Sequence, residues 1–146
     1  MTRSTVPVAP SWVRFGLVGA WGLFVLYASV SDPSGAPLAR TGPFGVVGLD
    51  KWLHALAYGV LAVLLAYALV PRWRGTWRGL LATLVLAAAY GIAIETLQYG
   101  LPHRSFDPSD LAANVFGALV VVVVVALGTR TLDRLGRGPR EEPRRR

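Results

Sequence analysis

The sequence predicts an all-α fold, an integral membrane bundle of four transmembrane helices with both termini on the cytoplasmic side. Composition, the length of the apolar stretches and the placement of basic residues lead to this prediction. The chain has 146 residues, of which 53% are hydrophobic and 16% are charged, and its mean hydropathy is +0.48. Because a soluble domain usually carries about 25% charged residues, this composition favours a lipid environment.

Four apolar stretches reach or approach the length of about 17 to 25 residues that a spanning helix needs. They cover residues 12–30, 52–70, 79–94 with a polar continuation to 99, and 111–127. None has the amphipathic stripe, with a period of about 3.6 residues, that a soluble four-helix bundle requires. The first stretch is longer than the apolar region of a signal peptide, so we expect it to be a retained helix.

Basic residues set the predicted orientation. Twelve arginines lie before the first stretch or at its start, between the second and third, or after the fourth, whereas Arg40, Lys51 and Arg104 fall on the other side. The positive-inside rule therefore places both termini in the cytoplasm. We expect a four-helix domain over residues 1–128, with its core motifs in 49–127, and a basic cytoplasmic tail over 129–146.

The net charge of +7 is explained by this topology and predicts no nucleic-acid partner, since no aromatic residues alternate with the arginines of the tail. A basic tail of this kind is expected to contact anionic lipid. The chain has no cysteine, which excludes disulfides and thiolate metal sites.

Polar residues gather at one end of three of the apolar stretches. They are Asp50, Lys51, His54 and Tyr58; Glu95, Gln98 and Tyr99; and Arg104, Asp107, Asp110 and Asn114. An ionisable group at the middle of a membrane helix costs about 2.5 to 3.5 kcal/mol on insertion scales, and less near the interface, so the clustering indicates a site. In the predicted topology all three ends meet at the extracytoplasmic face.

Spacing supports a single pocket at that face. Asp50, His54 and Tyr58 are four residues apart and share one flank of a helix, as do Asp110 and Asn114 on another. Structural explanations compete with a functional site: Asp107 fits a helix N-cap, Lys51 fits an interfacial anchor, and a hydrogen bond from His54 to Glu95 or Asp50 would lock two helices together.

The order and spacing of these residues resemble the signature of the VanZ family. This signature reads Asp50-Lys51-x-x-His54-x-x-x-Tyr58, then Glu95-x-x-Gln98, then Arg104 followed by Asp110-x-x-x-Asn114-x-x-Gly117. The family comprises small multi-pass membrane proteins named for a teicoplanin-resistance protein. The resemblance implies a protein of the cell envelope, sometimes linked to reduced susceptibility to glycopeptide antibiotics, and implies no particular reaction.

The leading hypothesis is a binding module of the cell membrane. Its pocket would bind an amphiphilic envelope molecule, such as a phosphorylated lipid, a lipid-linked glycan or a glycopeptide-related ligand. Membrane lipids are the other expected partners. The residues expected to contact the ligand are Lys51, Tyr58, Gln98, Arg104, Asp110 and Asn114. In this hypothesis Lys51 and Arg104, with the amino ends of two helices, would hold a phosphate.

Two other functions stay open. In an enzyme acting on an envelope lipid, His54 would be the general acid or base and Asp50 or Glu95 would orient it. Transport is less favoured, because the inner halves of the last three helices offer only Tyr67, Thr83 and Tyr90 as polar groups. A single credible histidine with scattered carboxylates is a poor ligand set compared with paired Glu-x-x-His motifs, so no metal and no other cofactor is predicted.

Overall fold

The computed structural model describes residues 8–31, 41–73, 76–102 and 106–135, and within them the fold is helical throughout. The elements are α1 (Ser11–Val30), a short 3-10 helix η1 (Pro43–Gly45), α2 (Leu49–Trp73), α3 (Trp77–Tyr99) and α4 (Pro108–Leu135). The four long helices are each long and apolar enough to cross a membrane, which confirms the predicted fold class. Their orientation relative to the two sides of the membrane stays a prediction.

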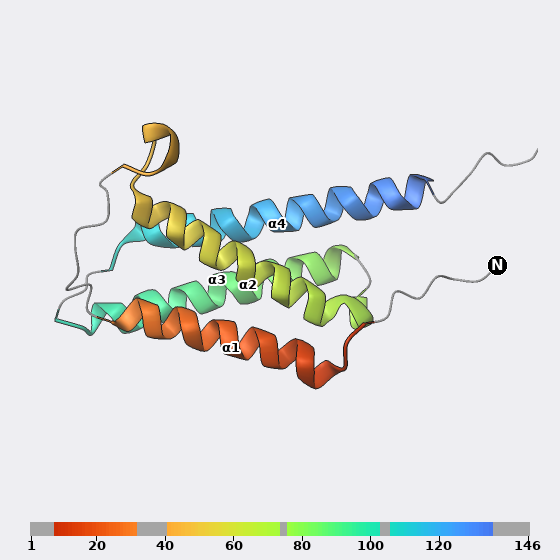
Figure 1. Ribbon diagram of the computed structural model, residues 1–146, viewed down its shortest axis with the longest axis horizontal. Coiled ribbons are helices and arrows are strands. Elements are labelled where there is room, and N and C mark those ends of the chain that lie inside the picture. The colour runs from red at the N-terminus through yellow and green to blue at the C-terminus, as the bar shows by residue number, and fades with distance from the viewer. Residues whose placement is uncertain (1–7, 32–40, 74–75, 103–105, 136–146) are drawn as a thin grey trace, which may run out of the picture.

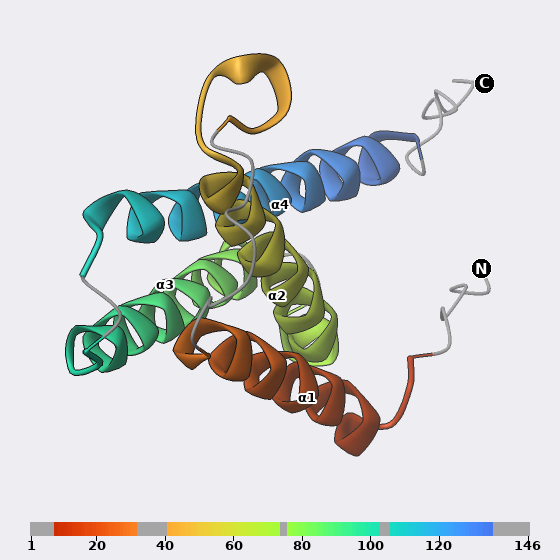
Figure 2. The ribbon, with the colours of Figure 1, turned by 60° about the vertical axis from the view of Figure 1, so that its left-hand side comes forward.

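Successive helices run in opposite directions (Figure 1). As a result, the start of α2, the end of α3 and the start of α4 lie at one end of the bundle, while α1 begins and α4 ends at the other. Both α1 and α4 pack against the central pair α2 and α3, and they lie on different sides of that pair (Figure 2).

Two helices are longer than the apolar stretches that predicted them. α4 continues to Leu135, eight residues beyond the expected end of its span, and α2 continues to Trp73. Loss of hydropathy marks where a helix leaves the lipid and does not by itself end its hydrogen bonding. The domain boundary at residue 128 therefore stays a prediction, and most of the proposed tail lies outside the described residues.

Small residues allow α2 and α4 to pack backbone against backbone. A Cβ atom added to Gly117 would overlap the carbonyl oxygen of Ala55, and one added to Gly59 would lie 3.6 Å from the carbonyl oxygen of Gly117. Close approach at small-xxx-small pairs is typical of membrane helices. This contact fixes how far α2 and α4 are shifted along each other. It therefore also fixes the relative positions of the polar residues at the starts of the two helices.

The buried core follows from these contacts. It contains Val25 of α1, Tyr58, Leu61, Ala62 and Leu65 of α2, Ala87 of α3 and Ala118 of α4. Most other large apolar side chains face outward, as expected for a protein surrounded by lipid rather than water.

Candidate binding site at the common helix end

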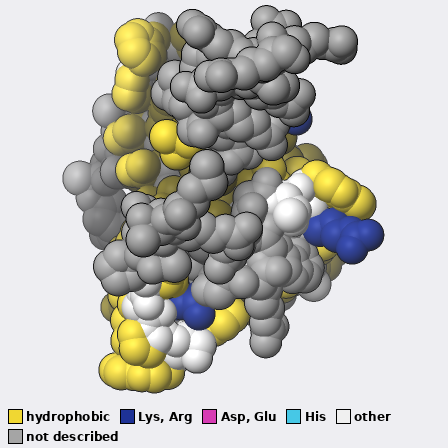
Figure 3. All heavy atoms as spheres, turned by 90° about the vertical axis from the view of Figure 1, so that its right-hand side faces the viewer, with side chains coloured by type: hydrophobic (Ala, Val, Ile, Leu, Met, Phe, Trp, Pro, Cys, Tyr) yellow, Lys and Arg dark blue, Asp and Glu magenta, His cyan; other side chains and the backbone are white. Residues whose placement is uncertain are grey.

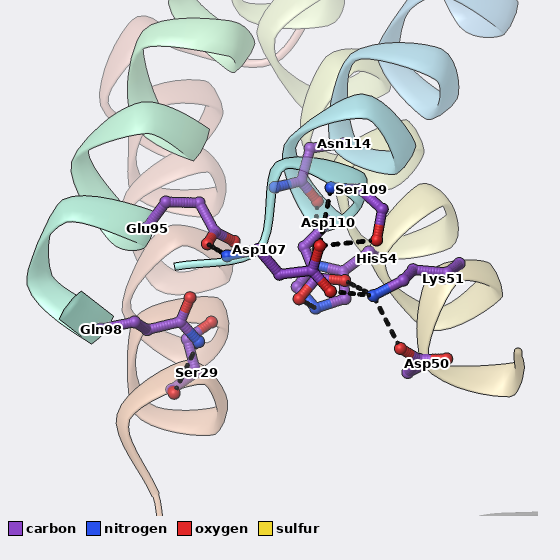
Figure 4. A network of polar contacts seen from close by, with 10 residues as sticks. All are labelled: Ser29, Asp50, Lys51, His54, Glu95, Gln98, Asp107, Ser109, Asp110 and Asn114. Atoms are coloured by element: carbon purple, nitrogen blue, oxygen red, sulfur yellow. Dashed lines mark hydrogen bonds and ion pairs between the residues drawn. The ribbon is translucent and has the colours of Figure 1, made fainter. Parts of the chain in front are cut away.

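The ammonium group of Lys51 forms the centre of an ion-pair network between the starts of α2 and α4 (Figure 4). Its Nζ atom lies 2.9 Å from Asp50 Oδ2 and 2.8 Å from Asp107 Oδ2, and it also pairs with Asp110 Oδ1. Three carboxylates thus share one lysine. The positive charge of Lys51 is used within the protein, which weakens the expectation that it holds a phosphate.

Asp107 is also the first residue before α4, where its Oδ1 atom accepts hydrogen bonds from the backbone N–H and the hydroxyl of Ser109 at 2.8 and 2.7 Å. This is the N-cap geometry that the sequence predicts. Lys51 and then Ser109 stabilise the ionised carboxylate and hold the pKa of Asp107 well below its usual range. The structural role of Asp107 is thereby accounted for.

His54 lies one turn deeper on α2 and faces α4. Its Nδ1 atom is 3.0 Å from Asn114 Oδ1, and its Nε2 atom is 3.6 Å from Asp110 Oδ2. An amide oxygen only accepts hydrogen bonds, so the Nδ1–H of His54 donates to Asn114. In the neutral ring this tautomer leaves the lone pair of Nε2 directed toward Asp110.

Three polar side chains below the ion pairs are almost fully buried. Glu95 is 0% exposed, Asn114 1% and Tyr58 2%. Glu95 Oε2 accepts a hydrogen bond of 3.3 Å from the backbone N–H of Asp107. Within the described ranges, Glu95 Oε1, Asn114 Nδ2 and the Tyr58 hydroxyl have no hydrogen-bond partner. Buried polar atoms are usually paired. These three atoms are exceptions, because each is buried without the hydrogen bond that it could form.

Gln98 connects this end of α3 to α1. Its side chain is 4% exposed, and Nε2 donates a hydrogen bond of 3.0 Å to the carbonyl oxygen of Ser29. Gln98 and Ser29 lie apart from the Lys51 network in Figure 4.

A groove of about 460 Å³ runs between α1 and α2 and reaches Gln98 of α3. Its apolar wall includes Trp21, Phe24, Val25, Leu53, Leu56 and Ala57, and its polar lining comes from Ser29, Asp50, His54, Tyr58 and Gln98. The groove is therefore apolar along most of its length. It is polar at the end of the bundle where α2 starts, α3 ends and α4 starts.

The structure brings together most of the residues that the sequence singled out. Asp50, Lys51, His54, Glu95, Asp110 and Asn114 form one connected cluster, with Tyr58 and Gln98 beside it. Tyr99 is 77% exposed and belongs to the surface. Arg104 and His103 lie outside the described residues. The three polar residues of the inner halves are all hydrogen-bonded within the protein. Thr83 donates to the carbonyl oxygen of Gly79 one turn earlier in α3, Tyr90 donates to the carbonyl oxygen of Gly22 in α1, and the Tyr67 hydroxyl accepts from the backbone N–H of Ala9 just before α1.

Sequence reasoning missed the contribution of α1. Trp21 and Ser29 line the groove, and the indole Nε1 of Trp21 donates a hydrogen bond of 2.9 Å to the carbonyl oxygen of Ala57. Arg14 is 7% exposed and donates to the carbonyl oxygens of Ala9 and Ala68. Arg14, a charge inside an apolar helix, is a sequence signal that α1 packs against α2, but it does not line the groove and so does not indicate the site.

Comparison with known proteins supports the resemblance seen in the sequence. Searches of the curated proteins and of the solved structures found no significant match. The sequence model of the VanZ/LLP1 family matches residues 9–129. This range includes α1, α2 and α3 and most of α4. This match covers most of the chain, so the protein belongs to the VanZ/LLP1 family.

Proposed function

We propose that this protein binds an amphiphilic molecule of the cell envelope, with the apolar part of the ligand along the groove and its headgroup at the polar end. The observation that carries the proposal is the composition of the groove, which joins an apolar wall from α1 and α2 to Asp50, His54 and Gln98. Ligand sites typically combine an apolar lining with a few polar groups that fix orientation.

Charge at the polar end favours one class of headgroup. Asp50 is 52% exposed at its side chain and presents carboxylate oxygens, while the ammonium of Lys51 is surrounded by three carboxylates. Such a surface accepts hydrogen bonds and repels a bare phosphate. A headgroup with hydroxyl or amino donors, as in a lipid-linked glycan, therefore suits this end better than a phosphorylated lipid without a sugar.

The groove opens beside α1, the helix with the smallest buried share of its span. Exposed Phe24 and Leu56 flank it at 56% and 65% exposure. A ligand dissolved in the membrane would reach the groove sideways, without passing through water. Lateral entry of this kind suits a lipid carrier better than a soluble ligand.

Ligand retention tests the proposal. The protein is purified in mild detergent, incubated with a polyprenyl phosphate or with the same carrier bearing a sugar, and examined by native mass spectrometry. We expect the sugar-bearing lipid to be retained, and Ala28→Trp, which fills the groove from α1, to reduce retention. Ala93→Trp is the matched control, since Ala93 is exposed on α3 away from the groove lining. Equal retention by both variants would contradict the proposal.

The orientation of the site is part of the proposal: we place the polar end at the extracytoplasmic face. The other end of the bundle, away from the polar cluster, carries Arg78 at the start of α3 and Arg130 and Arg134 near the end of α4. The charged side chains coloured at that end are basic (Figure 3). This distribution supports a cytoplasmic position for that end.

The absence of cysteine in the chain makes this orientation easy to test. A membrane-impermeant maleimide should label Val46→Cys, near the start of α2, in intact cells. It should label Arg78→Cys, at the start of α3, only after the membrane is opened. The reverse pattern would place the polar end in the cytoplasm.

A second candidate is catalysis on the bound lipid, because the contact with Asn114 fixes the ring of His54 at the polar end of the groove. In this case His54 would exchange a proton with the ligand, and Asp110, whose Oδ2 atom lies 3.6 Å from Nε2, would take the place that the sequence assigned to Asp50 or Glu95. Mass analysis of lipid incubated with the wild type and with His54→Gln distinguishes the two candidates. Conversion by the wild type alone supports catalysis, whereas unchanged lipid in both samples supports binding.

A further inference from the structure

His54, Glu95 and Asp110 come from three different helices, and one potential ligand atom of each lies within 4.8 Å of the others. We infer that these three side chains bind one divalent transition-metal ion, Zn²⁺ or Mn²⁺. The sequence predicted no metal, because a single histidine and scattered carboxylates match no paired motif. Folding supplies the proximity that the motif lacks. This inference does not depend on the proposed lipid.

In each of the three side chains, one polar atom forms a hydrogen bond or ion pair within the protein. The second polar atom stays available to a metal. His54 Nδ1–H donates to Asn114, Asp110 Oδ1 pairs with Lys51, and Glu95 Oε2 accepts from the N–H of Asp107. The remaining atoms are His54 Nε2, Asp110 Oδ2 and Glu95 Oε1. Hydrogen bonds that orient the far atom of each ligand are characteristic of metal sites.

The spacing of two of these atoms suits a bridging ion. His54 Nε2 and Asp110 Oδ2 are 3.6 Å apart, longer than an ordinary N–H···O hydrogen bond of about 2.7 to 3.2 Å. Bonds of about 2.0 to 2.2 Å at a tetrahedral angle place neighbouring ligand atoms roughly 3.3 to 3.5 Å apart. A small closure around an ion would satisfy both atoms.

Burial and charge favour a cation at the same place. Glu95 is 0% exposed, and among the described residues its Oε1 atom has no partner. A buried carboxylate oxygen without a donor is strongly unfavourable. In the described part of the cluster, four carboxylates face a single lysine: Asp50, Glu95, Asp107 and Asp110 against Lys51. A divalent ion would supply the missing positive charge.

The ligand types indicate which ions fit. One imidazole with two carboxylates suits Zn²⁺, a borderline ion that takes nitrogen and oxygen ligands, and the two carboxylates also suit Mn²⁺, whereas sites for Mg²⁺ and Ca²⁺ are built from oxygen ligands. Three protein ligands leave a coordination position for water. Coordination through Nε2 would also remove His54 from acid-base chemistry, so metal binding and the catalytic candidate make opposite demands on the same nitrogen.

Metal content tests the inference. The full chain is purified in detergent, stripped with a chelator, incubated with Zn²⁺ or Mn²⁺ and analysed by plasma mass spectrometry. We expect one ion per chain, and X-ray absorption of the Zn²⁺ form should show nitrogen and oxygen ligands. His54→Gln, Glu95→Gln and Asp110→Asn should each lose stoichiometric binding. Asn114→Leu, which frees the ring of His54, should weaken binding about 10- to 100-fold.

Asp50→Asn is the matched control, because it makes the same chemical change on the same cluster outside the three ligands, and it should keep the ion. Size-exclusion profiles and helical circular dichroism establish that each variant is folded. The inference fails if the wild type binds neither ion, or if all three ligand variants bind like the wild type. A nitrogen NMR spectrum that shows doubly protonated His54 in wild type incubated with Zn²⁺ would also overturn it, since a His54–Asp110 ion pair would then explain the geometry.

Discussion

The two outer helices are attached to the central pair by different means. α4 meets α2 at a glycine, with a backbone-to-backbone contact between Gly117 and Ala55, and is joined to it again by the Lys51 network. α1 has only 11% of its span buried and is tied to α2 and α3 by separate hydrogen bonds from side chains to backbone carbonyls. One interface is closely packed, and the other borders a groove.

From this difference we expect the α2–α4 side of the molecule to be rigid and the α1 side to be adjustable. In α2, α3 and α4, small residues and ion pairs fix the positions of the polar side chains to within a narrow range. Apart from the bond that buried Arg14 donates to Ala68 at the far end of α1, each hydrogen bond along α1 joins neutral groups and is worth little on its own, because such bonds between membrane helices average about 0.6 kcal/mol. A groove flanked by a lightly held helix can widen for a ligand without disturbing the cluster.

The largest expected effect follows from obstructing the close contact between α2 and α4. In Gly117→Ala, the new methyl group would overlap the carbonyl of Ala55, and the helices must separate. We expect a loss of about 3 kcal/mol in the free energy of unfolding, at the upper end of overpacking effects. Gly128→Ala is the control, because its Cβ meets nothing within 4 Å; it should be neutral or stabilising. Unfolding by a denaturing detergent measures both, and equal stability would refute the contact.

A somewhat smaller effect is expected from Lys51→Met. The substitution keeps most of the apolar stem and leaves Asp50, Asp107 and Asp110 without their shared cation. Because the Lys51 side chain is 20% exposed, we expect about 2 kcal/mol, below the 3 to 5 kcal/mol of a fully buried pair. Adding Asp107→Asn to this variant should recover part of the loss. If the second substitution destabilises the protein further, the carboxylates do not repel one another as described.

The smallest effect concerns α1. Tyr90→Phe removes the hydrogen bond to the carbonyl oxygen of Gly22 and should reduce stability by about 0.6 kcal/mol. It should nevertheless broaden the distribution of distances between spin labels placed on α1 and α3. Tyr27→Phe is the control on an exposed tyrosine of α1. A distribution that broadens equally in both variants would mean that the Tyr90 bond does not hold α1.

Hydropathy and spacing were sufficient to predict the four helices and the meeting of three polar clusters, because periodicity determines which residues share a flank. The pairing within the cluster could not be predicted in the same way. Lys51 was expected to face a ligand, yet the folded start of α4 places Asp107 and Asp110 against it. Likewise, nothing local in the sequence connects Gln98 to the carbonyl of Ser29, 69 residues away.

The share of α1 in the site was missed for a related reason. Its apolar residues look alike in sequence, and packing alone determines that Trp21 and Phe24 face the groove while others face lipid. Backbone carbonyls that accept hydrogen bonds, as at Ala57 and Gly22, carry no sequence signal at all.

Photo-crosslinking in native membranes tests the central claim most directly, because it identifies what occupies the groove. A benzophenone amino acid replaces Phe24, which lines the groove and is 56% exposed, or Phe116 of α4, which is 59% exposed and outside the groove lining. We predict that position 24 captures an amphiphile with a sugar- or amine-bearing headgroup, enriched over the bulk lipid captured at position 116. The same lipid profile at both positions would contradict a binding groove between α1 and α2.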